Sequence, residues 1–235
     1  MLKIKVYSLA LLGGLMIAST ANAGDWNGEG GLGFTSTSGN TDSSTLSARL
    51  SLGKEHGNWV HNTRLDLLKS SSSGVDSADR IVFIQKSQYN FAEKTFTFGR
   101  LRHEEDKFSG FNHQTIVSIG VGHVFINGVK HNLEASAGAG YKDLETNLGE
   151  DNQEAVFDGE FKYAYKISET SEFNQNFLVE SGSSNTYGKS ETFLKLVIVG
   201  NLGAKLGYEV THNTDVPVGT ENTDTITTVT LVYSF

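Results

Sequence analysis

The chain has 235 residues, no cysteine and a formal net charge of −8 at pH 7. Without cysteine it can form no disulfide, use no catalytic thiol and carry no lipid on an N-terminal cysteine. The acidic balance argues against nucleic acid as a partner, because binding to phosphates needs a surplus of basic side chains.

The start of the chain has the three parts of a secretory signal peptide. Lys3 and Lys5 form a basic start, an apolar run follows, and Ala21-Asn22-Ala23 supplies small residues for cleavage. The apolar run is too short for a membrane anchor, which needs about 20 residues. We therefore predict a cleaved signal peptide at residues 1–23 and one domain at residues 24–235.

The rest of the chain contains no apolar run of the roughly 18 residues that a transmembrane helix needs. Apolar and polar residues alternate instead, which is the period of a β-strand with two different faces. We predict the first three strands at residues 26–35, 46–53 and 59–67. Trp26 and Phe34 mark the apolar face of the first strand.

The middle of the chain is harder to interpret. Residues 69–79 are rich in serine and are predicted to form a loop, and residues 80–91 form a strand with apolar residues on both faces. In the next strand, Phe96 and Phe98 are expected to point outward, but Arg100 and Arg102 continue the same face. A β-bulge near Gly99 would resolve this conflict, because an extra residue exchanges the two faces.

The second half of the chain alternates clearly. A polar segment at residues 181–189 is expected to precede a strand with Leu194, Leu196 and Ile198 on its apolar face. The chain ends on the strand Val229–Phe235, whose apolar, outward face carries Tyr233 and Phe235.

The strands of this half bring the expected total to about twelve, an even number, and every second connector is short. These features predict a transmembrane antiparallel up-and-down β-barrel with short periplasmic turns and longer extracellular loops. Tyr233 and Phe235 resemble the terminal signal that the barrel-assembly machinery reads. The alternative is a secreted soluble β-sandwich.

The positions expected inside the barrel carry charges of both signs. Opposite charges could pair across a narrow lumen and nearly close it, or they could line a narrow, weakly selective pore for small solutes. We name Arg64, Asp66, Arg100, Arg102, Glu104, Glu160 and Lys162 as candidate site residues. The wider set expected inside also contains Arg49, Lys86, Glu134, Lys142, Asp158, Lys166, Glu180, Lys195, Lys205 and Glu209.

The densest charge cluster is the segment from Arg100 to Lys107. It could bind lipopolysaccharide of the outer leaflet or a substrate, since basic groups pair with phosphates. The alternative is a solvated loop base.

Asp143, Glu145, Asn147 and Glu154 come near the spacing of a calcium loop, but Leu148 stands where the turn glycine is needed. We therefore expect no metal and no cofactor.

Two motifs of lipid hydrolases are absent. The chain has neither a His-x-Ser pair nor a Gly-x-Ser-x-Gly motif. The nearest forms carry threonine, in His61-Asn62-Thr63, His113-Gln114-Thr115 and His212-Asn213-Thr214. We expect the protein not to be an enzyme. A lipid hydrolase or acyltransferase with a non-standard site, or a protein whose loops bind a partner, are the alternatives.

Several short segments together resemble one family. They are Ser38-Gly39-Asn40-Thr41-Asp42-Ser43, Asp106-Lys107-Phe108-Ser109-Gly110-Phe111, Gly120-Val121-Gly122-His123 and Val232-Tyr233-Ser234-Phe235. They are similar to the YdiY-like proteins, a domain of unknown function described as salt-induced outer-membrane proteins. The resemblance covers essentially the whole predicted domain. It implies a β-barrel in the outer membrane of a Gram-negative cell and induction by salt stress, and it supplies no catalytic or ligand-binding residues. We therefore expect an envelope barrel that contributes to stress adaptation, through limited passive permeation or by stabilising the outer leaflet.

Overall fold

The computed structural model describes residues 26–37, 43–108, 111–146, 149, 151–216 and 221–235. The predicted signal peptide lies outside these residues. Within the described ranges, no helix is long and apolar enough to cross a bilayer.

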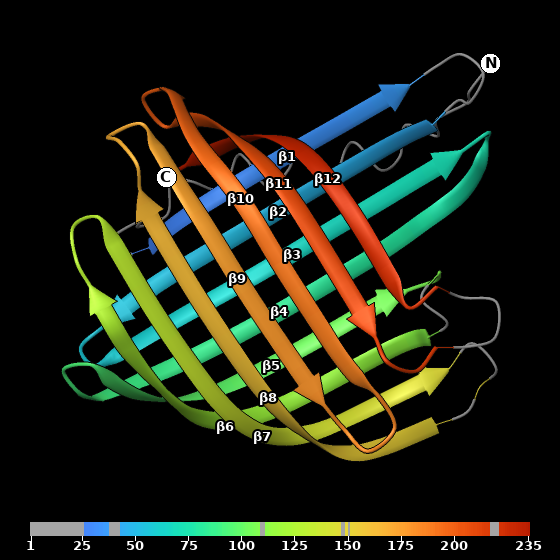
Figure 1. Cartoon of the computed structure of the whole chain (residues 1–235), viewed down its shortest axis with the longest axis horizontal. Coiled ribbons are helices and arrows are strands. Elements are labelled where there is room, and N and C mark those ends of the chain that lie inside the picture. Colours follow the sequence, from blue (N-terminus) through green and yellow to red (C-terminus); the bar gives the residue numbers. More distant parts are fainter. Residues whose placement is uncertain (1–25, 38–42, 109–110, 147–148, 150, 217–220) are drawn as a thin grey trace.

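Twelve antiparallel strands in the described ranges form one closed barrel, in which each strand pairs with its neighbours in the sequence (Figure 1). The predicted fold class is therefore confirmed. The strands are β1 (Trp26–Thr37), β2 (Ser43–His56), β3 (Trp59–Ser72), β4 (Val75–Ala92), β5 (Thr95–Asp106), β6 (Phe111–Asn127), β7 (His131–Thr146), β8 (Asp151–Lys166), β9 (Ser171–Ser181), β10 (Thr186–Val199), β11 (Leu202–Asn213) and β12 (Thr223–Ser234).

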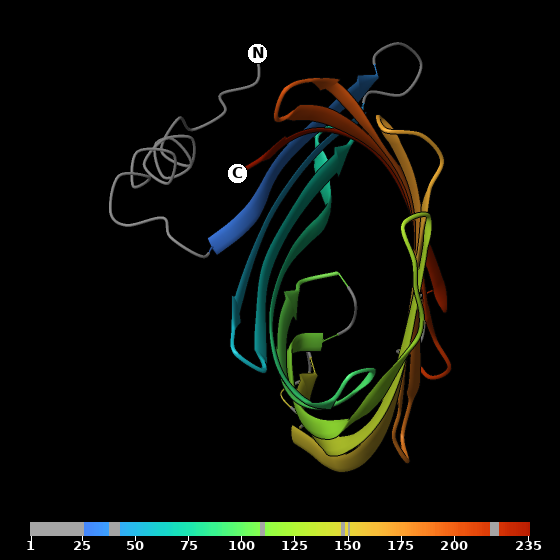
Figure 2. The ribbon, with the colours of Figure 1, turned by 90° about the vertical axis from the view of Figure 1, so that its left-hand side faces the viewer.

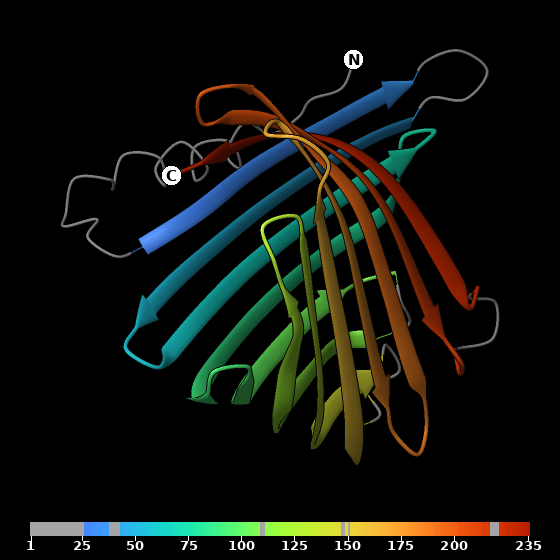
Figure 3. The same ribbon diagram turned by 60° about the vertical axis from the view of Figure 1, so that its left-hand side comes forward.

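The barrel closes where β12 pairs with β1. Residues Glu29–Gly33 pair with Thr230–Ser234, and two backbone hydrogen bonds between Gly28 and Phe235 extend this seam. The other ladders are longer than this one. Figures 2 and 3 show strongly tilted strands, with β1–β4 on one side of the barrel and β9–β12 on the other. Side chains from these two walls can therefore meet across the lumen.

The alternation predicted from the sequence separates an apolar outer face from a polar lumen. On β12, Val229, Leu231 and Tyr233 are more than half exposed, whereas Val232 between them is 2% exposed. Phe235 is also exposed on the outer face, beside the seam. An outward band of apolar side chains is what a barrel presents to the hydrocarbon of a membrane.

Aromatic rings gather on the outer face near the turns that follow the even-numbered strands. Trp59 lies 5.1 Å from Tyr89, and His131 stacks on Tyr165 at 4.6 Å between ring centroids. Such rings form girdles at the level of the lipid headgroups in transmembrane barrels. This end of the barrel therefore carries one membrane interface.

The predicted loop at residues 69–79 is wrong. Strands β3 and β4 continue through almost all of it, and only Ser73 and Gly74 form the turn. Both of these residues have a positive φ, which is the geometry of a tight two-residue hairpin turn. Serine and threonine are accommodated because their hydroxyls pair between neighbouring strands, as Thr45 does with Ser70 at 2.8 Å.

The predicted bulge at Gly99 is also wrong. The register of β5 with both neighbours runs through Gly99 without a shift, so Phe96 and Phe98 point into the lumen together with Arg100. The Lys86 ammonium lies 5.6 and 4.7 Å from the two ring centroids. A cation over an aromatic face is favourable, and this explains why rings and charges share one inner face.

Candidate functional site

The candidate site is the charged lumen. Because neighbouring side chains in a strand point to opposite faces, each strand sends every second residue inward. The charged residues predicted inside do lie on the inner face, where Lys166 is exposed because it stands at the end of β8. What the sequence could not give is which of these charges meet.

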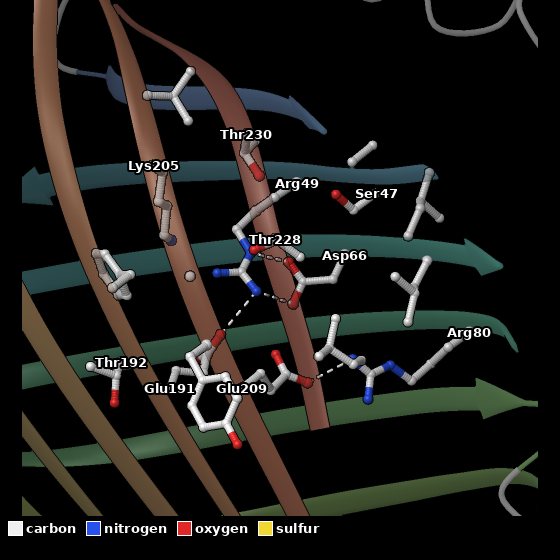
Figure 4. A pocket seen from close by; sticks show the side chains of 18 of the residues that line it. Ser47, Arg49, Asp66, Arg80, Glu191, Thr192, Lys205, Glu209, Thr228 and Thr230 are labelled. Atoms are coloured by element: carbon white, nitrogen blue, oxygen red, sulfur yellow. Dashed lines mark hydrogen bonds and ion pairs between the residues drawn. The ribbon is translucent and has the colours of Figure 1, made fainter. Parts of the chain in front are cut away.

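One group of ion pairs joins β2 and β3 to β10 on the opposite wall (Figure 4). The Arg49 guanidinium contacts Asp66 at 2.5 Å and Glu191 at 2.9 Å. Arg64 contacts the same two carboxylates, at 2.7 and 3.2 Å. Glu191 on β10 therefore binds two arginines from the opposite side of the barrel.

The same network continues toward β4 and β11. The Lys189 ammonium lies 4.0 Å from Glu191 and 3.1 Å from Glu209, and Glu209 also accepts a hydrogen bond from Arg80 at 2.7 Å. We call these seven residues the seam network: Arg49, Arg64, Asp66, Arg80, Lys189, Glu191 and Glu209. It contains four cations and three carboxylates.

A second group lies against β5 and β8 and is more deeply buried. Glu180 on β9 accepts hydrogen bonds from Arg100 at 2.9 Å and from Arg102 at 2.7 Å. Arg100 also lies 3.4 Å from Asp158, and Arg102 also contacts Glu104. We call these five residues the packed network, and it contains two cations and three carboxylates. Arg102 also stacks on Tyr187, 4.6 Å from the ring centroid.

A third group is charge-balanced. The Lys86 ammonium donates a hydrogen bond to Glu160 at 2.6 Å, and Lys162 lies 3.1 Å from the same carboxylate. Glu134 lies 3.8 and 4.0 Å from the two ammonium groups. This group connects β4 to β7 and β8, so charged side chains cross the lumen at this level as well.

Two cavities among the described residues lie between these groups. The seam cavity, of about 90 Å³, is bordered by β1–β4 and β10–β12, and the central cavity, of about 150 Å³, is bordered by β3–β5 and β8–β10. Arg80 and Glu191 line both cavities. The side chains of the seam network therefore stand between them.

The structure brings together the predicted site residues in pairs rather than in one cluster. Arg64 meets Asp66, Arg102 meets Glu104, and Glu160 meets Lys162. The segment 100–107 is divided by strand alternation, because Arg100, Arg102 and Glu104 face the lumen whereas His103 and Glu105 face outward. Lys107, in the turn after β5, binds Asp79 at 2.6 Å, and this hydrogen bond raises the pKa of its ammonium group. The segment thus presents no single surface to a phosphate.

The charged lumen residues missed in the sequence include Glu29, Arg80, Glu154, Lys189 and Glu191. Glu191 is the most important of them, and it was missed because β10 was expected to begin at Leu194 rather than at Thr186. The signal was present, since Tyr187, Lys189, Glu191 and Phe193 share one parity. A strand with charges and rings on its inner face was read as a polar loop.

The calcium-like spacing does not converge. The Asp143 carboxylate accepts a hydrogen bond from Gln153 at 2.7 Å on the outer face. Glu145, also outside, lies 3.6 Å from His113. Glu154 faces the lumen, where Lys142 contacts it at 2.5 Å and the Ser184 hydroxyl donates to it at 2.7 Å. Asn147 and Leu148 lie outside the described residues.

Histidines on the outer face pair with hydroxyls on the neighbouring strand. His61 pairs with Ser87 at 2.9 Å, His103 with Thr115 at 2.8 Å, His123 with Thr95 at 3.0 Å and His212 with Thr223 at 2.8 Å. Among these four described pairs, only the one of His103 has a carboxylate nearby. The Glu105 carboxylate lies 3.6 Å from the His103 ring. The repetition indicates that the pairing is a structural feature of this surface.

Comparison with known proteins gives one family and a set of similar folds. The sequence profile described as "Protein of unknown function, DUF481" matches residues 30–235. The Escherichia coli (strain K12) protein called "Uncharacterized protein YdiY" is 29% identical over 210 residues, which cover 86% of this chain and 80% of that protein.

Among solved structures, the NanC porin has a TM-score of 0.51 at 10% identity, covering 89% of this chain and 97% of the porin. The translocator domain of the autotransporter NalP from Neisseria meningitidis has a TM-score of 0.50 at 10% identity, covering 98% of this chain and 96% of that domain. At such low identity the likeness concerns the barrel fold alone.

Proposed function

The chain belongs to the DUF481 family, and we propose that it is an outer-membrane barrel that lets small solutes permeate slowly through a lumen narrowed by ion pairs. The barrel fold that it shares with a porin supports this proposal at the level of architecture. The observation that carries it is the interruption of the lumen at Glu191, which lines both cavities and binds arginines from the opposite wall.

The cavities are large enough for water and too small for a wide channel. One water molecule needs a cavity volume of about 10–15 Å³, so both cavities can hold several water molecules. The side chains between them are long and charged, and they can exchange partners without a change in the backbone. The lumen therefore fits intermittent passage of small solutes better than an open pore.

Salt should act directly on these ion pairs. The Debye screening length falls from about 10 Å at 0.1 M salt to about 3 Å at 1 M salt. Solvent-exposed ion pairs are screened more than buried ones. The side chains of Arg49 and Arg64 keep 25% and 23% of their surface exposed. We propose that high salt loosens these pairs and increases permeation, which would connect the lumen to adaptation to salt stress.

Planar-bilayer recording of the refolded protein tests this function. Folding is checked first by the heat-modifiable gel shift that intact barrels show. We expect small discrete conductance steps that increase with potassium chloride concentration more steeply than the bulk conductivity does. A folded barrel that stays silent at every salt concentration would overturn the proposal.

The proposal includes export and assembly. Residues 1–23 would direct secretion, and Tyr233 with Phe235 would be read by the barrel-assembly machinery. The outer apolar band would then contact outer-membrane lipid, including lipopolysaccharide. A variant lacking Phe235 should accumulate less heat-modifiable barrel in the outer-membrane fraction, and an unchanged amount would argue against this signal.

We also propose that the barrel is not an enzyme. Thr115, His103 and Glu105 are the nearest arrangement to a hydroxyl, imidazole and carboxylate triad, but the same hydroxyl pairing recurs at three other histidines without an acid. Refolded protein in phospholipid vesicles should release no fatty acid. Release that is lost in Thr115→Val would contradict this proposal.

A further inference from the structure

One row of facing residues crosses the closing seam on the lumen side. Lys205 on β11 faces Thr230 on β12. Thr230 faces Gly33 on β1, and Gly33 in turn faces Ser47 on β2. Lys205, Thr230 and Ser47 all line the seam cavity. Facing residues of neighbouring strands lie about 5 Å apart, so one small ligand can reach several members of this row.

The two hydroxyls of the row meet above the glycine. A Cβ placed on Gly33 would lie 2.6 Å from the Ser47 Oγ and 3.1 Å from the Thr230 Oγ1. The same Cβ would lie 2.8 Å from the Val229 carbonyl oxygen, so a side chain at position 33 would press on that oxygen and on both hydroxyls. Figure 4 shows Ser47 and Thr230 on the lining of the cavity. Neither hydroxyl has a hydrogen-bond partner among the described residues, so both can donate to a ligand.

Lys205 supplies a positive charge that no carboxylate neutralises within 4.0 Å among the described residues. Its ammonium lies 3.7 Å from the centroid of the Phe193 ring, a contact that leaves its N–H donors free. Four carboxylates also line this cavity (Glu29, Asp66, Glu191 and Glu209), and each of them already has a cationic partner other than Lys205. Arg49, which belongs to the seam network, lines the same cavity.

We propose that Lys205, Thr230 and Ser47 form a binding site for a small oxyanion, such as the carboxylate of a short organic acid, in the seam cavity. The ammonium group supplies the charge, the hydroxyls donate hydrogen bonds to the anion oxygens, and Gly33 adds no side chain that would press on these hydroxyls. Arg49 adds positive potential without leaving Asp66 and Glu191. A cavity of about 90 Å³ has room for roughly six water-sized groups, which limits the ligand to a few non-hydrogen atoms.

This inference rests on the proposed function, because a solute must reach the lumen, and it names the class of solute that the lumen prefers. The first experiment is the reversal potential of single channels in a gradient of potassium acetate. The wild type should prefer acetate over potassium. Lys205→Met should lower that preference about fivefold, the effect of one unit charge about 4 Å from an anion in water-like surroundings. Lys205→Arg should retain it.

Lys162→Met is the matched control, because it removes a lumen cation that lines the central cavity and already has two acidic partners. If both lysine variants lower the preference equally, the lumen charge acts as a whole and the Lys205 site is overturned. Ser47→Ala and Gly33→Ala should each weaken the preference while the heat-modifiable shift remains, and the lack of any effect in both would also overturn it.

A second measurement separates failure of the site from failure of the channel. A bound anion stabilises the folded barrel. The unfolding midpoint of the refolded wild type should therefore be higher in potassium acetate or inorganic phosphate than in potassium chloride of equal ionic strength, and Lys205→Met should remove the difference. If the channel is silent but this stabilisation is present, the site stands and the proposed permeation fails. If neither is seen, both fail.

Discussion

The lumen has two regions that follow the same alternation but differ in how tightly they are filled. In the packed region, against β5–β8, the side chains of Asp158 and Glu180 are 0% and 2% exposed. In the seam region, between β1–β3 and β10–β12, the charged side chains are partly exposed and border the seam cavity. The central cavity reaches the packed network at Arg100, Arg102 and Glu104, but not at Asp158 or Glu180. The comparison teaches that ion pairs alone do not close a barrel, and that the residues between them decide how much space remains.

Side-chain size explains the difference. Phe96, Ile116 and Val156 point into the packed region and are among the most deeply buried side chains of the described residues. The corresponding inner face of the seam region carries Ser47, Thr228 and Thr230, which are smaller. The signs of the charges differ too, because the packed network has a surplus of carboxylate and the seam network a surplus of cations.

The largest effect on stability is expected in the packed region. Glu180→Gln removes the carboxylate to which both Arg100 and Arg102 donate, and leaves these guanidinium groups buried with less compensation. Breaking a buried ion pair costs about 3–5 kcal/mol. Urea unfolding in lipid vesicles, followed by tryptophan fluorescence, should show a loss of this size. A decrease in the free energy of unfolding of less than about 1 kcal/mol would mean that water reaches the packed region as easily as the seam region.

A smaller effect should follow from adding volume to the packed region. The Cβ of Gly122→Ala would overlap the Phe96 ring, whereas a Cβ at Gly30, on β1, would meet nothing within 4 Å. Overpacking typically costs about 1–3 kcal/mol. The same unfolding measurement should therefore separate Gly122→Ala from the control Gly30→Ala. Equal stability of the two variants would contradict the difference in packing.

The smallest effect is expected beside the seam. Glu29 pairs with Lys195, and the two side chains are 24% and 30% exposed. Partly exposed pairs contribute about 0–1 kcal/mol, so Glu29→Gln should lower stability by less than about 1 kcal/mol. A loss as large as that of Glu180→Gln would remove the distinction between the two regions.

The sequence was sufficient for the architecture because strand alternation is a local pattern. It predicted the closing strand with Tyr233 and Phe235 outward, and the inward position of Arg64, Asp66 and Lys162. It could not orient Phe96 and Phe98, because a ring inside the lumen is stabilised by Lys86 on another strand. The rule that apolar residues face lipid fails at such positions.

The ion pairs themselves were beyond prediction for the same reason. Arg49 and Glu191 are 142 positions apart in the sequence, and they meet only because β2 and β10 face each other across a closed barrel. Glu191 was not predicted to face the lumen, because the start of β10 was predicted to be a loop. A local pattern gives the face of a residue, whereas its partner depends on the tilt and register of the whole barrel.

The central claim, that ion pairs on Glu191 narrow the lumen, is tested most directly by single-channel conductance of the wild type and Glu191→Gln from 0.1 to 1 M potassium chloride, a range over which screening increases strongly. We expect the wild type to conduct weakly at low salt and more than proportionally at high salt. Glu191→Gln should conduct more at low salt and follow the bulk conductivity. Proportional conductance in both proteins, with equal values at low salt, would contradict the account.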